Sequence, residues 1–137
     1  MSDESERCAG CGAVGCRAVL RDLCAHAAPD QQLLIDAYAA QHPGDASRRA
    51  IESLAVHLSS LCLQLERGAT PARAREGIIA ALAIAYRFVR LDPPAWIGAL
   101  TVADVAAGAD VRTWATLVWR AWAPHHATVR EWINASS

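Results

Sequence analysis

Apolar residues recur at every third or fourth position along most of this chain, and that spacing places them on one face of a helix. The clearest stripe lies in residues 46–66, where leucines and an isoleucine recur among charged and small polar residues. The same pattern predicts further helices over about 17–27, 30–41, 71–90 and 110–134. A short helix is also expected after Thr101. No segment shows the alternation of a half-buried strand. The sequence therefore predicts an all-α fold, a compact helical bundle of about five helices.

Prolines shape this pattern in two places. In the last predicted helix, Pro124 should break the helix, because proline removes one backbone hydrogen bond and clashes with the preceding turn. In the fourth, Thr70 and Pro71 form a start signal, with threonine as the cap and proline at the first helical position. This fourth helix is apolar on most sides from Ile78 to Val89, so we expect it at the centre of the bundle.

The composition is that of a globular protein without a strong charge. Of 137 residues, 53% are hydrophobic and 20% are charged, and the net charge is −1, which gives no overall attraction to nucleic acid. We expect one domain over residues 1–137, with residues 1–7 as a disordered tail and residues 8–16 as a cysteine-rich loop. No apolar run reaches the roughly 18 residues of a membrane span, and the acidic start shows no secretory signal. We therefore expect a cytoplasmic protein with no membrane or nucleic-acid partner.

Three cysteines within nine residues, Cys8, Cys11 and Cys16, form the most specific motif of the chain. A C-x2-C pair and a third cysteine on a glycine-rich loop suit a tetrahedral zinc site, because the short loop brings the sulfurs to one centre. The same residues could form a redox pair or a disulfide. Cytoplasmic proteins keep thiols reduced, and a redox C-x-x-C of the thioredoxin kind normally follows a strand. These arguments favour Zn²⁺ as the cofactor and leave Cys24 and Cys62 as core thiols.

Three cysteines leave a zinc ion one ligand short, and helix geometry favours His42 as the fourth. Cys16 begins the first predicted helix, and Cys24 and His26 lie roughly 12–15 Å further along it at 1.5 Å per residue. The second helix should return antiparallel after a tight turn at Pro29 and is about as long as the first. Its end at His42 then comes back level with Cys16.

The predicted metal ligands are three thiolates and one imidazole, from Cys8, Cys11, Cys16 and His42. Such a closed site would contribute directly to folding, and the protein would have a binding or regulatory role. His42 could instead cap the C-terminal end of its helix. In that case the fourth ligand would lie elsewhere, at His125 or His126.

Two adjacent histidines, His125 and His126, follow the proline of the last predicted helix. If the helix breaks at Pro124, both lie in the first turn of a new segment, where the helix dipole favours the neutral imidazole. His57 lies at the edge of the stripe in 46–66 and could face the same interior. The three are therefore candidate catalytic residues of a metalloenzyme with an open metal position. The alternative is structural, a histidine bonded to a carbonyl that the proline frees.

Five segments together resemble a known family: Cys-Ala-Gly-Cys-Gly, Asp-Ala-Tyr-Ala-Ala-Gln-His-Pro-Gly, Ser-Leu-Ala-Val-His-Leu, Leu-Glu-Arg-Gly and Trp-Ala-Pro-His-His-Ala-Thr-Val-Arg-Glu-Trp. Over nearly the whole chain, the sequence resembles a bacterial domain-of-unknown-function family of small proteins that contain cysteine and histidine. The resemblance implies that the family's motif positions here are Cys8, Cys11, Gln41, His42, His57, His125 and His126. It implies no activity.

Overall fold

The computed structural model describes residues 8, 10–12, 14–26 and 30–137, so the expected tail at 1–7 and the expected turn at Pro29 lie outside the described residues. The described chain forms seven α-helices, two short 3-10 helices and no β-sheet. They are α1 (Cys16–Cys24), α2 (Gln31–Gln41), α3 (Arg48–Leu65), α4 (Pro71–Leu82), η1 (Ala85–Arg87), α5 (Val102–Ala106), α6 (Val111–Ala121), η2 (Ala123–His125) and α7 (His126–Ser136). The all-α prediction is confirmed, and the predicted count of about five helices is too low.

Pro124 accounts for part of this difference. Residues 110–134, predicted as one helical pattern, form α6, the 3-10 turn η2 and α7. The break is confirmed and follows from the missing N–H of the proline and its clash with the preceding turn. The short helix expected after Thr101 is α5. It begins with a capping box, in which the Thr101 hydroxyl accepts a hydrogen bond from the Ala103 N–H and the Asp104 carboxylate accepts one from the Thr101 N–H.

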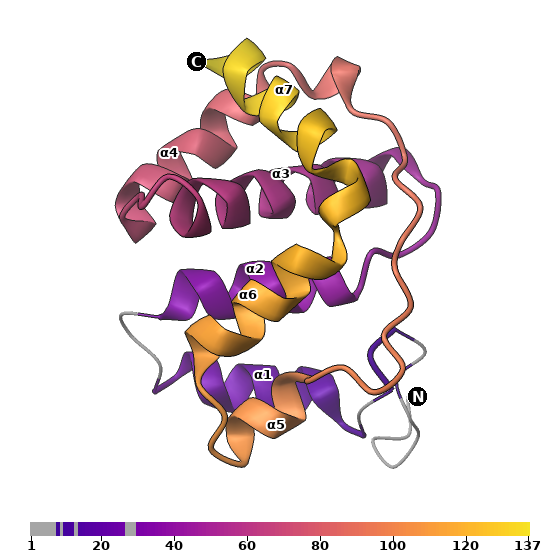
Figure 1. Cartoon of the computed structure of the whole chain (residues 1–137), viewed down its shortest axis with the longest axis vertical. Helices are drawn as coiled ribbons and strands as arrows, with labels where there is room; N and C mark the ends of the chain where they lie inside the picture. The colour runs from indigo at the N-terminus through magenta and orange to yellow at the C-terminus, as the bar shows by residue number, and fades with distance from the viewer. Residues whose placement is uncertain (1–7, 9, 13, 27–29) are drawn as a thin grey trace.

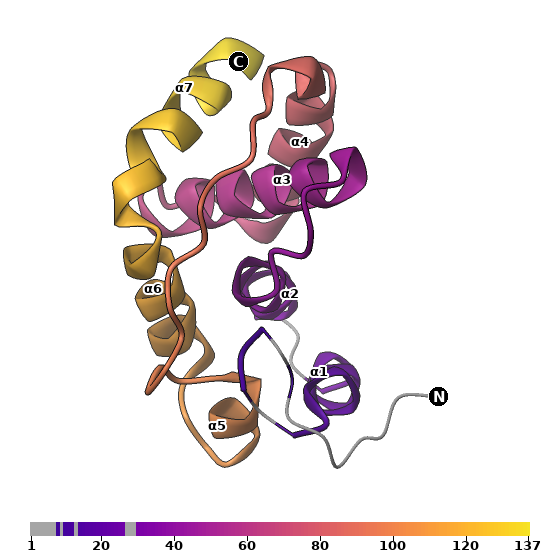
Figure 2. The same cartoon turned by 90° about the vertical axis from the view of Figure 1, so that its right-hand side faces the viewer.

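The helices stack in layers along the long axis of the molecule (Figures 1 and 2). Helices α4 and α7 pack on α3, α3 packs on α2, and α6 packs on α2 from the side. Helices α1 and α5 lie together at the far end, with α1 against α2. The largest fully buried side chains include Trp114, Trp122, Phe88, Leu34, Leu58 and Leu61. This order brings α1 and the cysteine loop beside α2 and keeps them away from α4.

Helix α4 corrects the prediction that residues 71–90 form a central helix. It ends at Leu82, and two of its apolar side chains, Ile79 and Leu82, are 71% and 50% exposed. The buried residues of α4 are small, Ala74 and Ala81. A Cβ at Gly77 would lie 2.4 Å from Leu63 Cδ1 of α3, so the glycine permits the close approach. The outer face stays in solvent and α3 takes the central place. No helix of the described chain is long and apolar enough to cross a membrane.

Residues 88–100 form a connecting segment that runs from η1 down one side of the molecule to α5 (Figure 1). Phe88 anchors its upper end against Trp132, with ring centroids 4.9 Å apart. At the lower end, the Gln41 side-chain amide donates a hydrogen bond to the Leu100 carbonyl at 2.7 Å. The segment has no regular structure, and it places Trp96 beside the C-terminal end of α2.

Candidate metal centre

The structure brings the four predicted ligand atoms together. The sulfurs of Cys8, Cys11 and Cys16 and a ring nitrogen of His42 all lie within 4.8 Å of one another. In a tetrahedral zinc site with the usual bond lengths, two sulfurs lie about 3.8 Å apart and a sulfur and a nitrogen about 3.6 Å apart. The distance from Cys16 Sγ to His42 Nε2 is 3.5 Å. The cluster therefore has the dimensions and the donor set to hold a metal ion such as zinc.

Glycines give the cysteine loop its shape. Gly12 has a φ of +81° and Gly15 a φ of +63°, backbone conformations that favour glycine, and Gly15 precedes α1, which begins at Cys16. The Gly12 N–H donates to the Cys8 carbonyl at 2.9 Å, and the Gly10 N–H donates to Cys8 Sγ at 3.3 Å. The loop thus turns tightly around the first sulfur and delivers the third cysteine at the start of a helix.

Gly10 lets the loop lie directly on the end of α2. A Cβ at this position would come within 2.9 Å of His42 Cδ2 and 3.0 Å of the Gln41 carbonyl oxygen. Real Cβ atoms essentially never approach another atom below 3.0 Å, so a larger residue would push the loop away from the imidazole. The first cysteine pair and the histidine are therefore held together by backbone contact as well as by their side chains.

Two tryptophans hold the C-terminal end of α2. The indole N–H of Trp122 donates to the Ala40 carbonyl at 3.1 Å, and that of Trp114 donates to Gln41 Oε1 at 3.3 Å. Gln41 is fully buried, and its amide also bonds to the connecting segment. The residue directly before His42 is thus fixed by α6 and by residues 88–100. These contacts fix the backbone next to His42 without the help of a metal ion.

The orientation of His42 suits a metal ligand. Its Nδ1 lies 2.6 Å from the Tyr38 carbonyl oxygen, so Nδ1 carries the proton and the lone pair of Nε2 points to the sulfurs. Burial lowers the pKa of His42, which favours the neutral imidazole that a metal requires. The ring stacks on that of Tyr38, with centroids 4.0 Å apart. His42 ends α2, but its side chain bonds one carbonyl and faces the cysteines, which favours the ligand interpretation over a simple cap.

Hydrogen bonds support the sulfurs. Tyr38 Oη lies 3.4 Å from Cys16 Sγ. Burial, and then the contact with Cys16, raises the pKa of the Tyr38 phenol, so the hydroxyl stays protonated and donates to the sulfur. At Cys8, burial raises the thiol pKa, but the backbone N–H groups of Cys11 and Gly10 outweigh it, and the net pKa is lowered. The surroundings of Cys8 therefore favour its thiolate.

The two remaining cysteines lie outside the cluster. Cys62 is fully buried in α3, and burial followed by the charge of Glu66 raises its thiol pKa to about 12. Cys24, at the end of α1, is half-buried, and burial raises its thiol pKa too. Both pack in or against the core, as the sequence predicts, and both favour the neutral thiol.

The other three histidine candidates do not converge. His57 Nδ1 bonds to Asp36 Oδ1 at 2.8 Å, His125 Nε2 bonds to the Asp92 carbonyl at 3.0 Å, and His126 Nε2 bonds to the Trp119 carbonyl at 2.7 Å. The His126 ring also stacks on the Trp119 ring. Within the described ranges, none of the three belongs to a group of metal-ligating side chains. Only His126 bonds to a carbonyl close to the proline break, as in the structural alternative, whereas His125 bonds to the connecting segment and His57 to a buried carboxylate.

Asp36 centres a polar cluster that the sequence analysis missed. Its carboxylate is fully buried between α2 and α3 and accepts hydrogen bonds from His57 Nδ1 at 2.8 Å, Ser60 Oγ at 2.5 Å, Gln64 Nε2 at 2.8 Å and Gln32 Nε2 at 3.0 Å. The signal in the sequence is an acidic residue inside the apolar stripe of 30–41. A buried charge there requires donors from the facing helix.

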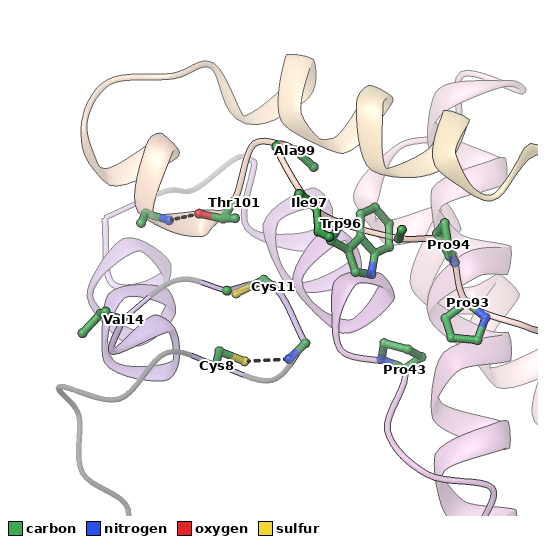
Figure 3. A pocket seen from close by; sticks show the side chains of 15 residues that line it. Cys8, Cys11, Val14, Pro43, Pro93, Pro94, Trp96, Ile97, Ala99 and Thr101 are labelled. Atoms are coloured by element: carbon green, nitrogen blue, oxygen red, sulfur yellow. Dashed lines mark hydrogen bonds between the residues drawn. The ribbon is translucent and has the colours of Figure 1, made fainter.

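A pocket of about 830 Å³ adjoins the metal centre (Figure 3). Cys8 and Cys11 line it on the side of the loop, and Trp96, Pro93 and Pro94 line it on the side of the connecting segment. Cys11 is buried, whereas Cys8 is half-buried. No lysine, arginine, aspartate or glutamate is among the described lining residues. Two thiols of the cluster thus line a pocket without a charged side chain among its described lining residues, and Cys8 is the more exposed of the two.

Comparisons with known proteins give a family but no function. No curated protein and no solved structure matches this chain. The sequence profile of the family of unknown function DUF5946 matches residues 6–123, a range that contains all four residues of the metal centre. This match covers most of the 137 residues and confirms the resemblance found in the sequence. The chain belongs to DUF5946, a family of unknown function.

Proposed function

We propose that the protein binds one zinc ion through Cys8 Sγ, Cys11 Sγ, Cys16 Sγ and His42 Nε2. The observation that carries the proposal is the approach of these four atoms within 4.8 Å of one another. Thiolates and imidazole are soft or borderline ligands that suit zinc, whereas calcium and magnesium prefer oxygen. The contact between His42 Nδ1 and the Tyr38 carbonyl supplies the outer hydrogen bond that metal-ligating histidines usually make.

The role we propose for the ion is structural. Four protein ligands complete a tetrahedral zinc site and leave no position for water, which is typical of sites that stabilise a fold. The ligands come from the loop, from the first residue of α1 and from the end of α2, so the ion joins three parts of the chain. Because the ligands must be thiolates, a reducing compartment such as the cytoplasm keeps them available, and this is the location we propose. The joined region would serve a binding or regulatory function.

Metal analysis tests this proposal. The purified protein should contain about one zinc per chain, as a four-ligand structural site requires. Each of the variants Cys8→Ser, Cys11→Ser, Cys16→Ser and His42→Ala should lose most of it. Cys24→Ser and His26→Ala are matched controls, because both residues lie at the other end of α1, and they should keep the metal. Equal zinc content in ligand variants and controls would contradict the proposal.

Cobalt provides a test that does not depend on whether a variant folds. The unmodified chain loaded with Co²⁺ should show the visible bands of a tetrahedral ion and the near-ultraviolet charge transfer of bound thiolates. His42→Ala should change the visible bands, since a nitrogen ligand is lost, whereas His26→Ala should not. A spectrum of octahedral cobalt without thiolate charge transfer would also contradict the proposal.

A further inference from the structure

The sulfurs of the metal centre differ in accessibility. Cys11 and Cys16 are 6% and 7% exposed, whereas Cys8 is half-buried. Cys16 Sγ is further enclosed by contacts with Tyr38 Oη and His42 Nε2. Cys8 Sγ receives the Gly10 N–H at 3.3 Å and adjoins the pocket. A molecule in the pocket can therefore reach one sulfur of the cluster more easily than the other two.

The charge of the proposed site makes that sulfur reactive. Three thiolates and a neutral imidazole around a divalent cation carry a net charge of −1, so the negative charge of the thiolates is not fully neutralised. The thiolate is the nucleophilic form of cysteine, and ligation keeps it deprotonated at neutral pH. Accessibility then decides which of the three reacts.

The pocket defines the kind of molecule that could approach. Its volume of about 830 Å³ is within the range of small-molecule sites. Pro43, Pro93, Pro94 and Trp96 line it, and at its rim Ile97 is 100% exposed and Val14 is 47% exposed. Figure 3 shows the loop with Cys8 on one side and Pro93, Pro94, Trp96 and Ile97 of the connecting segment on the other. An uncharged molecule with an apolar body matches this surface, and exposed apolar residues around a hollow are typical of binding sites.

We infer that Cys8 is a nucleophilic site that accepts an alkyl group from an uncharged, apolar electrophile held in the pocket. In this step, which rests on the proposed zinc site, Cys8 Sγ supplies the electron pair for a new S–C bond. The bond between that carbon and its leaving group breaks, and the leaving group departs as an anion with the bonding pair. The product is a thioether at Cys8. A thioether binds zinc more weakly than a thiolate does, so the reaction loosens the attachment of the loop to α2 and can signal exposure to the electrophile.

Site-resolved labelling tests the inference. The zinc-loaded protein is treated with a limiting amount of benzyl bromide, an apolar alkylating agent, and the modified cysteine is identified by mass spectrometry of peptides. Cys8 should be labelled at least about tenfold faster than Cys11, Cys16 or Cys24, because it combines thiolate character with access. Cys8→Ser should remove the fast reaction, and Cys24→Ser should not.

A second pair of variants tests the role of the pocket. Ile97→Asp places a charge at the rim and should slow benzyl labelling of Cys8 roughly fivefold, the effect of losing part of one apolar contact. Ile79→Asp, on the exposed face of α4, is the matched control and should have no effect. Equal rates in these two variants would overturn the role of the pocket.

Zinc content measured in the same samples separates the two proposals. A zinc-bound protein in which Cys11, Cys16 or Cys24 reacts as fast as Cys8 overturns this inference and leaves the metal site intact. A protein that binds no zinc overturns the proposed function itself.

Discussion

Helix α2 carries two polar clusters that differ in what completes them. The cluster around Asp36 lies between α2 and α3 and is complete by itself, because four side chains donate to one carboxylate. The cluster at the C-terminal end of α2 gathers three thiols and a ring nitrogen. Its donors, the Gly10 N–H and the Tyr38 hydroxyl, approach it from outside. These four atoms lie within 4.8 Å of one another and could hold a metal ion, which the Asp36 cluster does not need.

The histidines make the same contrast. His57 directs its Nδ1 to the buried carboxylate, so its bond closes a network. His42 gives its Nδ1 to a backbone carbonyl and keeps Nε2 toward Cys16. The first arrangement stabilises a helix pair, and the second prepares a lone pair for a ligand. A histidine in a helical protein is therefore interpreted by the partner of each nitrogen and not by its burial alone.

Metal removal should have the largest effect and should separate the two clusters. A chelator should destabilise the protein by about 4 kcal/mol if free zinc had been a thousandfold above its Kd. Hydrogen exchange should quicken in α1 and at the end of α2, and α3 should stay protected around the Asp36 cluster. Zinc should restore protection and magnesium should not. Uniform loss of protection in α1 and α3 would show that the two clusters are not independent.

Asp36→Ala should give the next largest effect, on folding and not on metal binding. It leaves the buried Ser60 hydroxyl without its acceptor and takes one of three acceptors from the Gln64 amide, and breaking such a network costs about 3 kcal/mol. Zinc affinity should stay within about twofold, because Asp36 and His42 are roughly 9 Å apart along α2 and distant sites act independently. Urea unfolding and zinc titration measure the two quantities. Asp22→Ala, at an exposed position of α1, is the control, and equal unfolding midpoints for both variants would refute the assigned role of Asp36.

Tyr38→Phe should lower zinc affinity and leave the stability of the fold almost unchanged, the reverse of Asp36→Ala, and its effect should be smaller. The variant keeps the ring that stacks on His42 and the carbonyl that orients it, and loses the hydroxyl that donates to Cys16 Sγ. Loss of an outer hydrogen bond lowers metal affinity by about tenfold, which competition with a coloured chelator measures. Tyr86→Phe, at a position that is 78% exposed, should change nothing. An unchanged zinc affinity in Tyr38→Phe would show that the hydroxyl does not support metal binding.

Removing the charge of Glu66, which takes part in a partly exposed polar contact, should have the smallest effect on stability. The bonds from Arg130, opposed by burial and aided by Trp119, lower the pKa of Glu66 from 4.5 to about 2. Because the folded-state pKa is depressed, the stabilisation is fully present above pH 4.5 and is lost as the pH falls toward 2. Glu66→Gln should therefore be less stable than the parent by about 1 kcal/mol or less at pH 7, and the two should converge as the pH falls through about 2. A constant difference between them in urea unfolding would contradict this.

The sequence predicts the cysteine and histidine cluster because its residues are close in the chain. Cys16 begins one helix and His42 follows the end of the next, and the two helices have similar lengths. An antiparallel arrangement of the two therefore brings these residues together. The Asp36 cluster is different, since three of its four donors come from α3 at positions that spacing alone does not pair with α2. A carboxylate inside an apolar stripe is the available signal, and its partners follow only from the packing of the helices.

Two other features of the fold depend on how helices and loops pack, which the spacing of apolar residues in the sequence does not predict. Helix α4 is apolar on several sides, and the close approach at Gly77 decides which side meets α3. The connecting segment over 88–100 has no repeating pattern, so nothing in its residues predicts that Trp96 and Ile97 lie opposite Cys8 across a pocket. The fold class was thus accessible from the sequence, and the surroundings of the site were not.

The position of the four ligands in the chain has a consequence for how the protein is made. All of them lie within the first 42 residues, whereas the tryptophans that hold the end of α2 come from residues 114 and 122. Translation proceeds at about 5–20 residues per second, so the complete ligand set leaves the ribosome several seconds before those tryptophans. Contacts between residues close in sequence form fastest. If the cluster binds the proposed zinc ion, a nascent chain can thus capture that ion first and fold the remaining layers onto a metal-bound N-terminal corner.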